Sequence, residues 1–173
     1  VKKDCSGQPG PTQLLCMGVG IAQIKKIKNM SIYYHKFEVR WSDIDANRHL
    51  ANSTYMEYCA QTRMAFMNRY KMGLAQMNRW GIGPVILHER YSFFKEIYAD
   101  QTVIVTLEVG GASEDASIYQ FVHKFYLPDG THCATAEATG VWIDMMLRKS
   151  TNPPDDIVEV LNDFKSENTK LMS

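Results

Sequence analysis

The sequence contains no apolar run long enough to cross a lipid bilayer and no excess of charge of either sign. One mildly apolar stretch, residues 14–24, is interrupted by glycine and falls short of the roughly 20 residues that a membrane-spanning helix needs. The 19 lysine and arginine residues balance 19 aspartate and glutamate residues, and the basic residues do not cluster. We therefore expect neither a membrane span nor a nucleic-acid partner.

Cysteine is scarce, and the few cysteines lack the spacing of a metal site. Cys5, Cys16, Cys59 and Cys133 do not show zinc-ligand spacing, and no His, Cys or Asp residues resemble a ligand set. Two of the four fall in expected core elements, which favours plain packing in a reducing compartment. We expect no bound metal and a cytoplasmic location.

The length of 173 residues is that of one domain with a real core, and the composition is ordinary for a globular protein. Lysines flank the apolar stretch of residues 14–24, and Met30 stands directly before the first strand-like pattern. We expect residues 1–29 to be an N-terminal extension outside the fold, with a targeting role as the alternative. Residues 30–173 are expected to form the domain.

A strand and then a long helix are predicted by two different periods in the first half of the chain. One face of residues 33–41 carries Tyr33, His35, Phe37, Val39 and Trp41, and the other carries Tyr34, Lys36, Glu38 and Arg40. This period of two predicts a half-buried strand. After Asn52 the period is 3.6, with Tyr55, Cys59, Phe66 and Tyr70, flanked by Met56 and Met67, on one side. We expect Asn52, Ser53 or Thr54 to cap this helix, with Thr54 and Glu57 as a capping box.

The rest of the chain predicts an antiparallel sheet. Strand patterns cover residues 85–95, 103–109, 117–127 and 132–144, with a short helical turn at 74–80 and a surface helix at 155–165. Pro128-Asp129-Gly130 predicts a tight hairpin, and small residues in the last strand leave room for a helix to cross it. One sheet and one long helix must bury each other, so the expected fold class is α+β.

Polar side chains gather in the turn between the first strand and the long helix. Asp45, Asn47 and His49 lie just ahead of a helix N-terminus, where free backbone N–H groups can stabilise an oxyanion. Simple turn and capping chemistry is the alternative explanation for each residue taken alone. Together, a carboxylate, an amide and an imidazole at this place indicate a candidate catalytic site.

This stretch resembles a known family. The pattern D-x-D-A-x-x-H-x-x-N-x-x-Y, from Asp43 to Tyr55 and followed by Arg63, resembles the hotdog-fold thioesterases related to 4-hydroxybenzoyl-CoA thioesterase. The D-x-N-x-H spacing is also similar to that of plant acyl-ACP thioesterases. The resemblance covers residues 31–154 and implies a hotdog fold, in which an antiparallel sheet wraps around a long central helix. It also implies a homodimer or homotetramer whose subunits share their active sites.

The resemblance assigns roles to individual residues. It implies that Asp45 is the essential carboxylate, as nucleophile or general base, with Asn47 and His49 assisting and Asp43 structural. The substrate would be an acyl-CoA or an acyl carrier protein thioester, and no cofactor is expected beyond the CoA within the substrate. The expected substrate-binding residues are Asn52, Ser53, Thr54 and Tyr55 at the start of the helix, together with Arg63 and Arg90.

Two arginines raise separate questions. Arg63 falls within the apolar face of the helix, where a guanidinium needs an acceptor; we expect a pair with Asp43 or Glu137, or contact with the substrate or a partner subunit. Arg90 and Lys95 are candidates for holding the CoA phosphates, because acids occupy the loop that is basic in the family's type member. His88, His123 and His132 are expected to be structural.

The expected function is therefore hydrolysis of an acyl thioester. One alternative is a hotdog hydratase of enoyl thioesters, although such enzymes resemble D-x-N-x-x-H, which is one residue longer than the spacing here. Another is a non-catalytic module that binds acyl thioesters. The acyl chain, the thiol carrier and the choice between nucleophile and general base for Asp45 stay open.

Overall fold

The computed structural model describes residues 32–172, so the expectation for residues 1–29 lies outside the described part of the chain. The strands are β1 (Tyr33–Glu38), β2 (Ile82–Phe93), β3 (Thr102–Ala112), β4 (Ile118–Tyr126), β5 (His132–Asp144) and β6 (Lys165–Leu171). The helices are α3 (Asn52–Arg69), α4 (Leu74–Trp80) and α5 (Asp155–Asp163), with a 3₁₀ turn, η1, at Trp41–Asp43. None of the described helices is both long and apolar enough to span a membrane.

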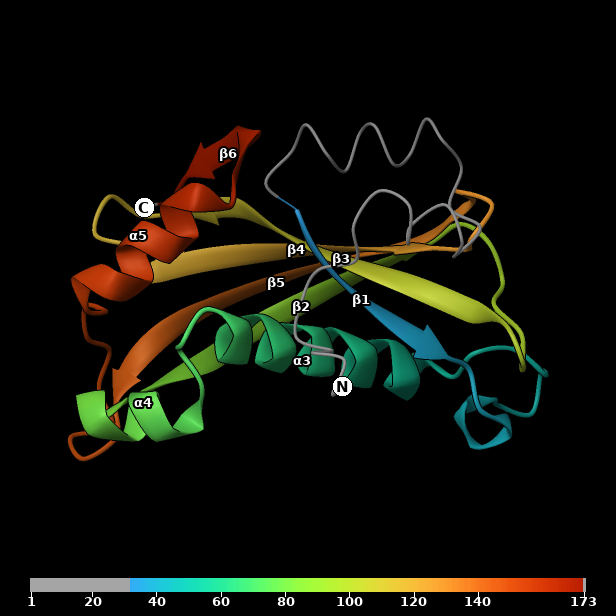
Figure 1. The fold of residues 1–173 in the computed structure, drawn as a ribbon, viewed down its shortest axis with the longest axis horizontal. Coiled ribbons are helices and arrows are strands. Elements are labelled where there is room, and N and C mark those ends of the chain that lie inside the picture. The colour runs from blue at the N-terminus through green and yellow to red at the C-terminus, as the bar shows by residue number, and fades with distance from the viewer. Residues whose placement is uncertain (1–31, 173) are drawn as a thin grey trace, which may run out of the picture.

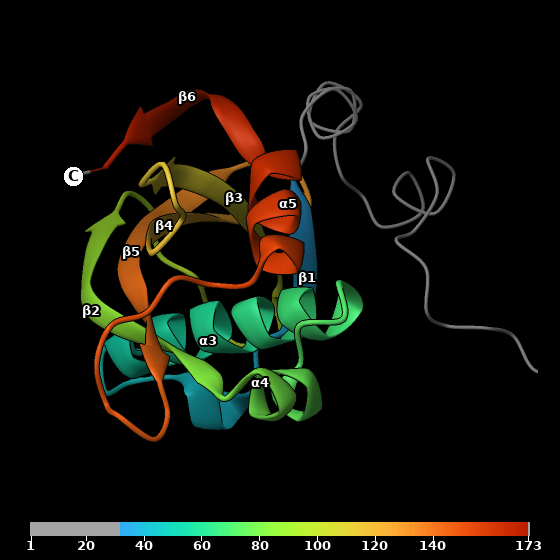
Figure 2. The ribbon, with the colours of Figure 1, turned by 90° about the vertical axis from the view of Figure 1, so that its left-hand side faces the viewer.

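The strands form one sheet in the order β1-β3-β4-β5-β2, and every neighbouring pair on this path is antiparallel. β6 adds to β3 in parallel, beyond the part of β3 that pairs with β1. The sheet curves around α3, with β2 at one edge and β1 toward the other (Figures 1 and 2). The predicted hotdog fold is confirmed.

The central helix α3 is buried because the apolar side chains of its inner face pack against apolar side chains of the sheet. Tyr55, Tyr58 and Cys59 pack with Ala134 and Ala136 at the N-terminal half of α3. Phe66 and Met67 pack in a second cluster with residues of β3, β4 and α5 at the other half. Arg63 lies between the two apolar clusters and is itself only 9 % exposed.

Several local expectations are wrong. Trp41 is 86 % exposed, because β1 ends at Glu38 and the chain turns into η1, while Tyr34 is buried instead. Met56 is 52 % exposed and does not belong to the apolar face of α3. The strand β6 was not predicted at all, because its polar sequence shows no period and its pairing with β3 is made by the backbone.

The capping expectation is also wrong. The N-cap of α3 is Ala51, without a side-chain cap, and Asn52 is the first helical residue. The Thr54 hydroxyl donates to the Asp43 carbonyl instead. This bond ties the start of α3 to the segment that precedes the polar turn.

Gly140 in β5 gives a stability prediction. A Cβ at this position would lie 2.6 Å from the Tyr119 hydroxyl and 2.7 Å from the Val85 carbonyl oxygen. We expect Gly140→Ala to lower the free energy of unfolding by about 1–3 kcal/mol, because both neighbours are fixed by packing or by the backbone. Gly83→Ala in the paired strand is the matched control, since its Cβ would meet only the flexible end of Met145. Equal midpoints in urea for the two variants would contradict this account.

Candidate active site

The polar turn ahead of α3 is a compact loop closed by its own backbone. The Asp45 N–H donates to the His49 carbonyl at 3.0 Å, and the Arg48 N–H donates to the Asp45 carbonyl at 3.0 Å. Arg48 takes a positive φ of 71° to complete this turn. The loop therefore presents Asp45, Asn47 and His49 from a fixed backbone at the entrance to the helix.

Asp45 is the centre of this loop. Its Oδ1 accepts the Asn47 backbone N–H at 2.8 Å, and its Oδ2 lies 3.5 Å from the Asn47 side-chain nitrogen. The His49 Nδ1 lies 3.7 Å from Asp45 Oδ1. The three residues expected to carry the chemistry are thus side by side, and each side chain keeps some contact with solvent.

Glu96 completes the group and was not expected from the sequence. Its Oε1 lies 3.5 Å from His49 Nε2, so the imidazole stands between two carboxylates, and the Tyr98 hydroxyl donates to Glu96. The Leu50 N–H donates to the Ile97 carbonyl at 2.7 Å, which joins the segment after β2 to the polar turn. Glu96 is far from His49 in sequence, and only this tertiary link could have identified it.

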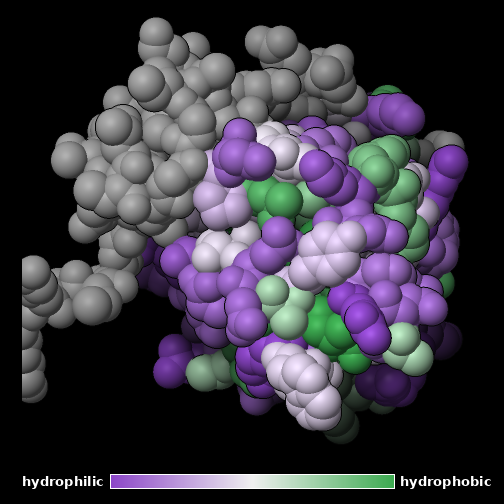
Figure 3. All heavy atoms as spheres, turned by 90° about the vertical axis from the view of Figure 1, so that its right-hand side faces the viewer, coloured by the Kyte–Doolittle hydropathy of each residue, from purple (hydrophilic) through white to green (hydrophobic). Residues whose placement is uncertain are grey.

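A cavity of about 330 Å³ opens beside these residues. It is lined by His49, Leu50, Asn52, Tyr55, Phe93, Phe94, Lys95 and Glu96. Figure 3 looks onto this end of the molecule, where apolar surface is exposed between polar residues. The cavity thus combines titratable groups with an aromatic wall formed by Tyr55 and Phe93, whose rings meet edge to face at 4.9 Å. Burial raises the pKa of Tyr55 to about 12, so its phenol stays neutral.

The expected oxyanion donors need a correction. The N–H groups of Thr54 and Tyr55 are already used, because both donate to the Ala51 carbonyl, at 2.9 and 3.3 Å. Within the described residues, the N–H groups of Asn52 and Ser53 have no backbone acceptor. These two groups, at the first positions of the helix and the positive end of its dipole, are therefore the ones available to an oxyanion.

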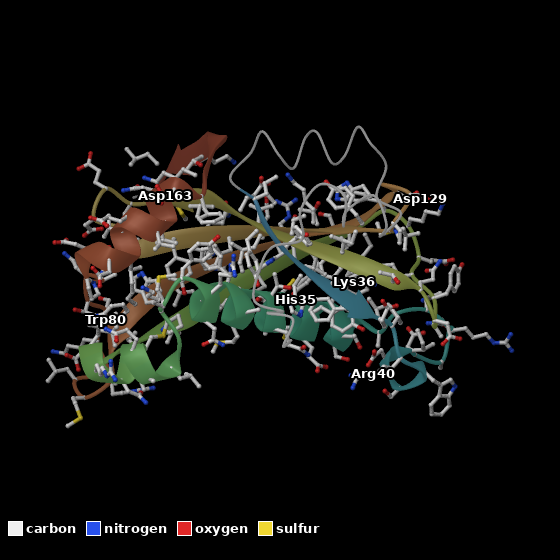
Figure 4. The ribbon with its side chains drawn as sticks, in the orientation of Figure 1. His35, Lys36, Arg40, Trp80, Asp129 and Asp163 are labelled. Atoms are coloured by element: carbon white, nitrogen blue, oxygen red, sulfur yellow. The ribbon has the colours of Figure 1, made fainter. Side chains whose placement is uncertain are left out.

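Asp43 holds the site but faces away from solvent. It is 4 % exposed and accepts hydrogen bonds from the Arg40 backbone and guanidinium and from the Tyr58 hydroxyl. Burial acts to raise the pKa of this carboxyl, but the bonds from Arg40 and Tyr58 outweigh burial and lower the pKa. Figure 4 shows Arg40 and Asp129 at this end of the molecule, opposite the end marked by Trp80 and Asp163.

The sequence suggested that Arg63 pairs with Asp43 or Glu137, but it pairs with neither. Its Nη1 lies 3.0 Å from Glu89 Oε1 in β2 and 3.4 Å from His123 Nε2 in β4. Glu137 is excluded because its neighbours Ala136 and Ala138 are each only 1 % exposed and lie on the buried face of β5, so Glu137 between them points to the opposite face. The positive charge of the buried Arg63 is therefore balanced by the carboxylate of Glu89 in the edge strand β2.

His123, Arg90 and Lys95 were also singled out from the sequence. His123 is fully buried, its Nδ1 lies 3.0 Å from the Thr106 carbonyl, and burial followed by the Arg63 charge lowers its pKa to about 3. The neutral ring then donates from Nδ1 and accepts from Arg63 at Nε2. Arg90 is paired in register with Glu137, away from the cavity lining, whereas Lys95 lines the cavity. Among the described residues, no group of His, Cys, Asp and Glu side chains is arranged to hold a metal ion.

The structure is similar to those of several solved proteins. The structure resembles a 1,4-dihydroxy-2-naphthoyl-CoA thioesterase from Synechocystis, with a TM-score of 0.69 and 15 % identity, over 76 % of this chain and 96 % of that one. It resembles a Staphylococcus aureus protein solved in complex with CoA, with a TM-score of 0.70 and 18 % identity, over 78 % and 86 % of the two chains. A Pseudomonas aeruginosa protein, PA2801, gives a TM-score of 0.67 and 24 % identity over 75 % and 97 %. At these identities the likeness shows the hotdog fold.

Sequence comparison decides the family. No curated protein matches the sequence. The sequence model of one family, described as the thioesterase-like superfamily, does match residues 39–161. This range is well over half of the chain and includes the polar turn, α3 and the residues that line the cavity. This chain belongs to the thioesterase-like superfamily.

Proposed function

We propose that the protein hydrolyses an acyl thioester, carried by CoA or by an acyl carrier protein, to a free acid and a thiol. The observation that carries the proposal is that His49 and Glu96 line a cavity together with Asn52, whose backbone N–H is available, while Asp45 lies beside His49. Membership of the thioesterase-like superfamily supports the reaction class. The structural neighbour solved with CoA supports CoA as a thiol carrier.

The chemistry follows from this arrangement. The thioester carbonyl oxygen would lie against the Asn52 and Ser53 N–H groups, which stabilise the negative charge that develops when the carbonyl carbon is attacked. As a general base, Asp45 takes a proton from a water molecule while the water oxygen bonds to that carbon. The carbon–sulfur bond then breaks, and the thiolate leaves and takes up a proton.

The nucleophilic route uses the same groups. An Asp45 oxygen bonds to the carbonyl carbon, the carbon–sulfur bond breaks, and the thiolate leaves and takes up a proton. Water then hydrolyses the resulting anhydride, which releases the acid and restores Asp45. In both routes His49 bridges Asp45 and Glu96 and fixes the position of the Asp45 carboxylate. Asn47 donates its backbone N–H to the same carboxylate oxygen, Oδ1, that His49 approaches.

The test is thiol release from acetyl-, octanoyl-, palmitoyl- and benzoyl-CoA and from octanoyl acyl carrier protein, with the full chain. We expect release from at least one of these thioesters well above the rate without protein. In parallel, crotonyl-CoA is followed for loss of its double bond. Hydration of crotonyl-CoA without thiol release from any thioester would overturn the proposal and favour a hydratase.

We further propose that the protein is a homodimer, or a tetramer built from such dimers, paired along β2. Within the described residues β2 pairs only with β5, so its outer edge offers free backbone groups, and Leu87 on this strand is 58 % exposed. An unpaired edge of this length normally pairs or is protected.

Light scattering tests this assembly. The expected mass is at least twice the 19.8 kDa of the chain. Leu87→Lys should shift the protein toward the monomer, because it places a charge on the proposed interface. Leu74→Lys, at an exposed leucine of α4, is the control and should keep the wild-type mass. A monomeric wild type would contradict the proposal.

A further inference from the structure

The turn after β5, residues 144–149, holds two large apolar side chains out in solvent. The Asp144 Oδ1 atom accepts the backbone N–H groups of Met146 and Leu147 at 2.8 and 2.7 Å. The Arg148 N–H donates to the Asp144 carbonyl at 2.9 Å and closes the turn. Met146 is 89 % exposed and Leu147 is 70 % exposed. The turn therefore owes its shape to Asp144 and to the backbone, and the folded state needs neither apolar side chain.

The helix α4 lies next to this turn. The Met145 N–H donates to the carbonyl of Gly81, the residue that follows α4, at 2.9 Å. Figure 1 shows the turn and α4 together at the end of the molecule opposite η1. Leu74, the first residue of α4, is 64 % exposed. Strongly exposed apolar side chains from two segments that are distant in sequence therefore share one end of the protein.

The charges that these two segments carry are positive. Residues 64–81 and 145–154 contain no aspartate or glutamate. They contribute four exposed cations, Lys71, Arg79, Arg148 and Lys149. Among the side chains that the structure describes, none of the four is in a salt bridge. Asp144 is turned to the backbone of its own turn, and α3 lies between α4 and the acidic start of α5 in Figures 1 and 2.

A cavity of about 290 Å³ opens between the end of α3 and α4. Lys71 and Arg79 line it together with the exposed Leu74, and the amide side chains of Asn68 and Gln76 complete its polar wall. No carboxylate is among the residues that line it. Cations and amide N–H groups donate hydrogen bonds to the oxygens of a phosphate, so this cavity suits a negatively charged headgroup.

We propose that this end of the protein docks onto a membrane surface that contains anionic phospholipid. Met146, Leu147 and Leu74 enter the boundary between headgroups and acyl chains, where burial of apolar surface is favourable, and the four cations contact lipid phosphates. A second copy is a poorer occupant, because a two-fold contact through this surface brings like charges together. Nucleic acid is also a poorer occupant, since methionine and leucine offer the bases no ring to stack on.

The test is sedimentation of the full chain with vesicles, either of phosphatidylcholine alone or of equal parts of phosphatidylcholine and phosphatidylglycerol. We expect wild type to bind the anionic vesicles at least about tenfold more tightly, and less tightly as salt is added, because salt screens the attraction. Met146→Gln with Leu147→Gln, and separately Arg148→Gln with Lys149→Gln, should each weaken this binding at least about tenfold. All four side chains are exposed, so both double variants should keep the wild-type thermal midpoint.

Leu171→Gln is the matched control and should bind the vesicles as wild type does. Leu171 is 74 % exposed but lies at the end of β6, on the other side of the molecule in Figure 2. Three results would overturn the inference: no binding of wild type to anionic vesicles at low salt, equal binding to both kinds of vesicle, or wild-type binding by the apolar double variant. A lower mass of that variant in light scattering, without vesicle binding by wild type, would make this surface a contact between copies instead.

Discussion

Asp45→Asn is expected to lower kcat for thioester hydrolysis by about 10²–10⁴-fold, because the amide can neither take a proton from water nor attack the carbonyl. The substitution is nearly isosteric, and the amide oxygen can still accept the Asn47 backbone N–H that Asp45 Oδ1 accepts now. The loop should therefore keep its shape. The measurement is thiol release at saturating substrate, with the thermal midpoint as the check on folding.

Asp100→Asn is the matched control. Asp100 is an exposed aspartate in a surface turn with a φ of 62°, a conformation that asparagine also tolerates. Its activity should equal that of wild type. Turnover of Asp45→Asn within a few-fold of wild type would remove Asp45 from the chemistry and point to Glu96 as the acting carboxylate.

Arg63→Leu is expected to lower the free energy of unfolding by about 3–5 kcal/mol, because it leaves the Glu89 carboxylate buried without its cation. A loss of this size is a large part of the total stability of a typical domain. Adding Glu89→Leu should recover most of the loss, since an apolar pair of similar volume suits the two clusters that flank this position. Urea unfolding of the single and double variants measures both effects.

The control for this experiment is Arg79→Leu, at an exposed arginine of α4 whose guanidinium donates to Gln76 at 3.3 Å. Its stability should change by no more than about 0.5 kcal/mol. If Arg63→Leu changed the free energy of unfolding as little as Arg79→Leu does, the Arg63–Glu89 ion pair would contribute little to stability. If the double variant were as unstable as the single one, the cost would come from lost packing rather than from the unpaired carboxylate.

The order of the elements could be predicted from the sequence because each depends on a local period. The alternation before Val39, the helical period after Asn52 and the hairpin at Pro128-Asp129-Gly130 are all visible without tertiary information. The strand β6 shows no such period, since it is held by backbone pairing to β3 and by the Thr169 hydroxyl, which donates to the Val109 carbonyl. The end of β1 was misplaced because Trp41 continues the alternation although the chain has already turned.

The candidate site also contains residues that could be predicted from the sequence and one that could not. Asp45, Asn47 and His49 are close in sequence, so their proximity in a turn could be inferred directly. Glu96 could not, because it reaches His49 only through the pairing of the segment after β2 with Leu50.

The partner of Arg63 was missed for a related reason. A β-bulge between Ile86 and His88 shifts the register of β2 against β5, so that both Ile86 and Glu89 reach the core side of the strand. Simple alternation along residues 85–95 does not reveal this change. The sequence showed that Arg63 needs an acceptor but not which acid provides it.

A single-turnover experiment tests the central claim most directly. Octanoyl-CoA labelled in the acyl group is mixed with an excess of the full chain, and the reaction is stopped with acid at successive times. The account predicts conversion of the label to free octanoic acid with equal release of CoA by wild type, and intact octanoyl-CoA with Asp45→Asn. Label that stays as octanoyl-CoA bound to wild type would contradict the account and make the protein an acyl-thioester-binding module.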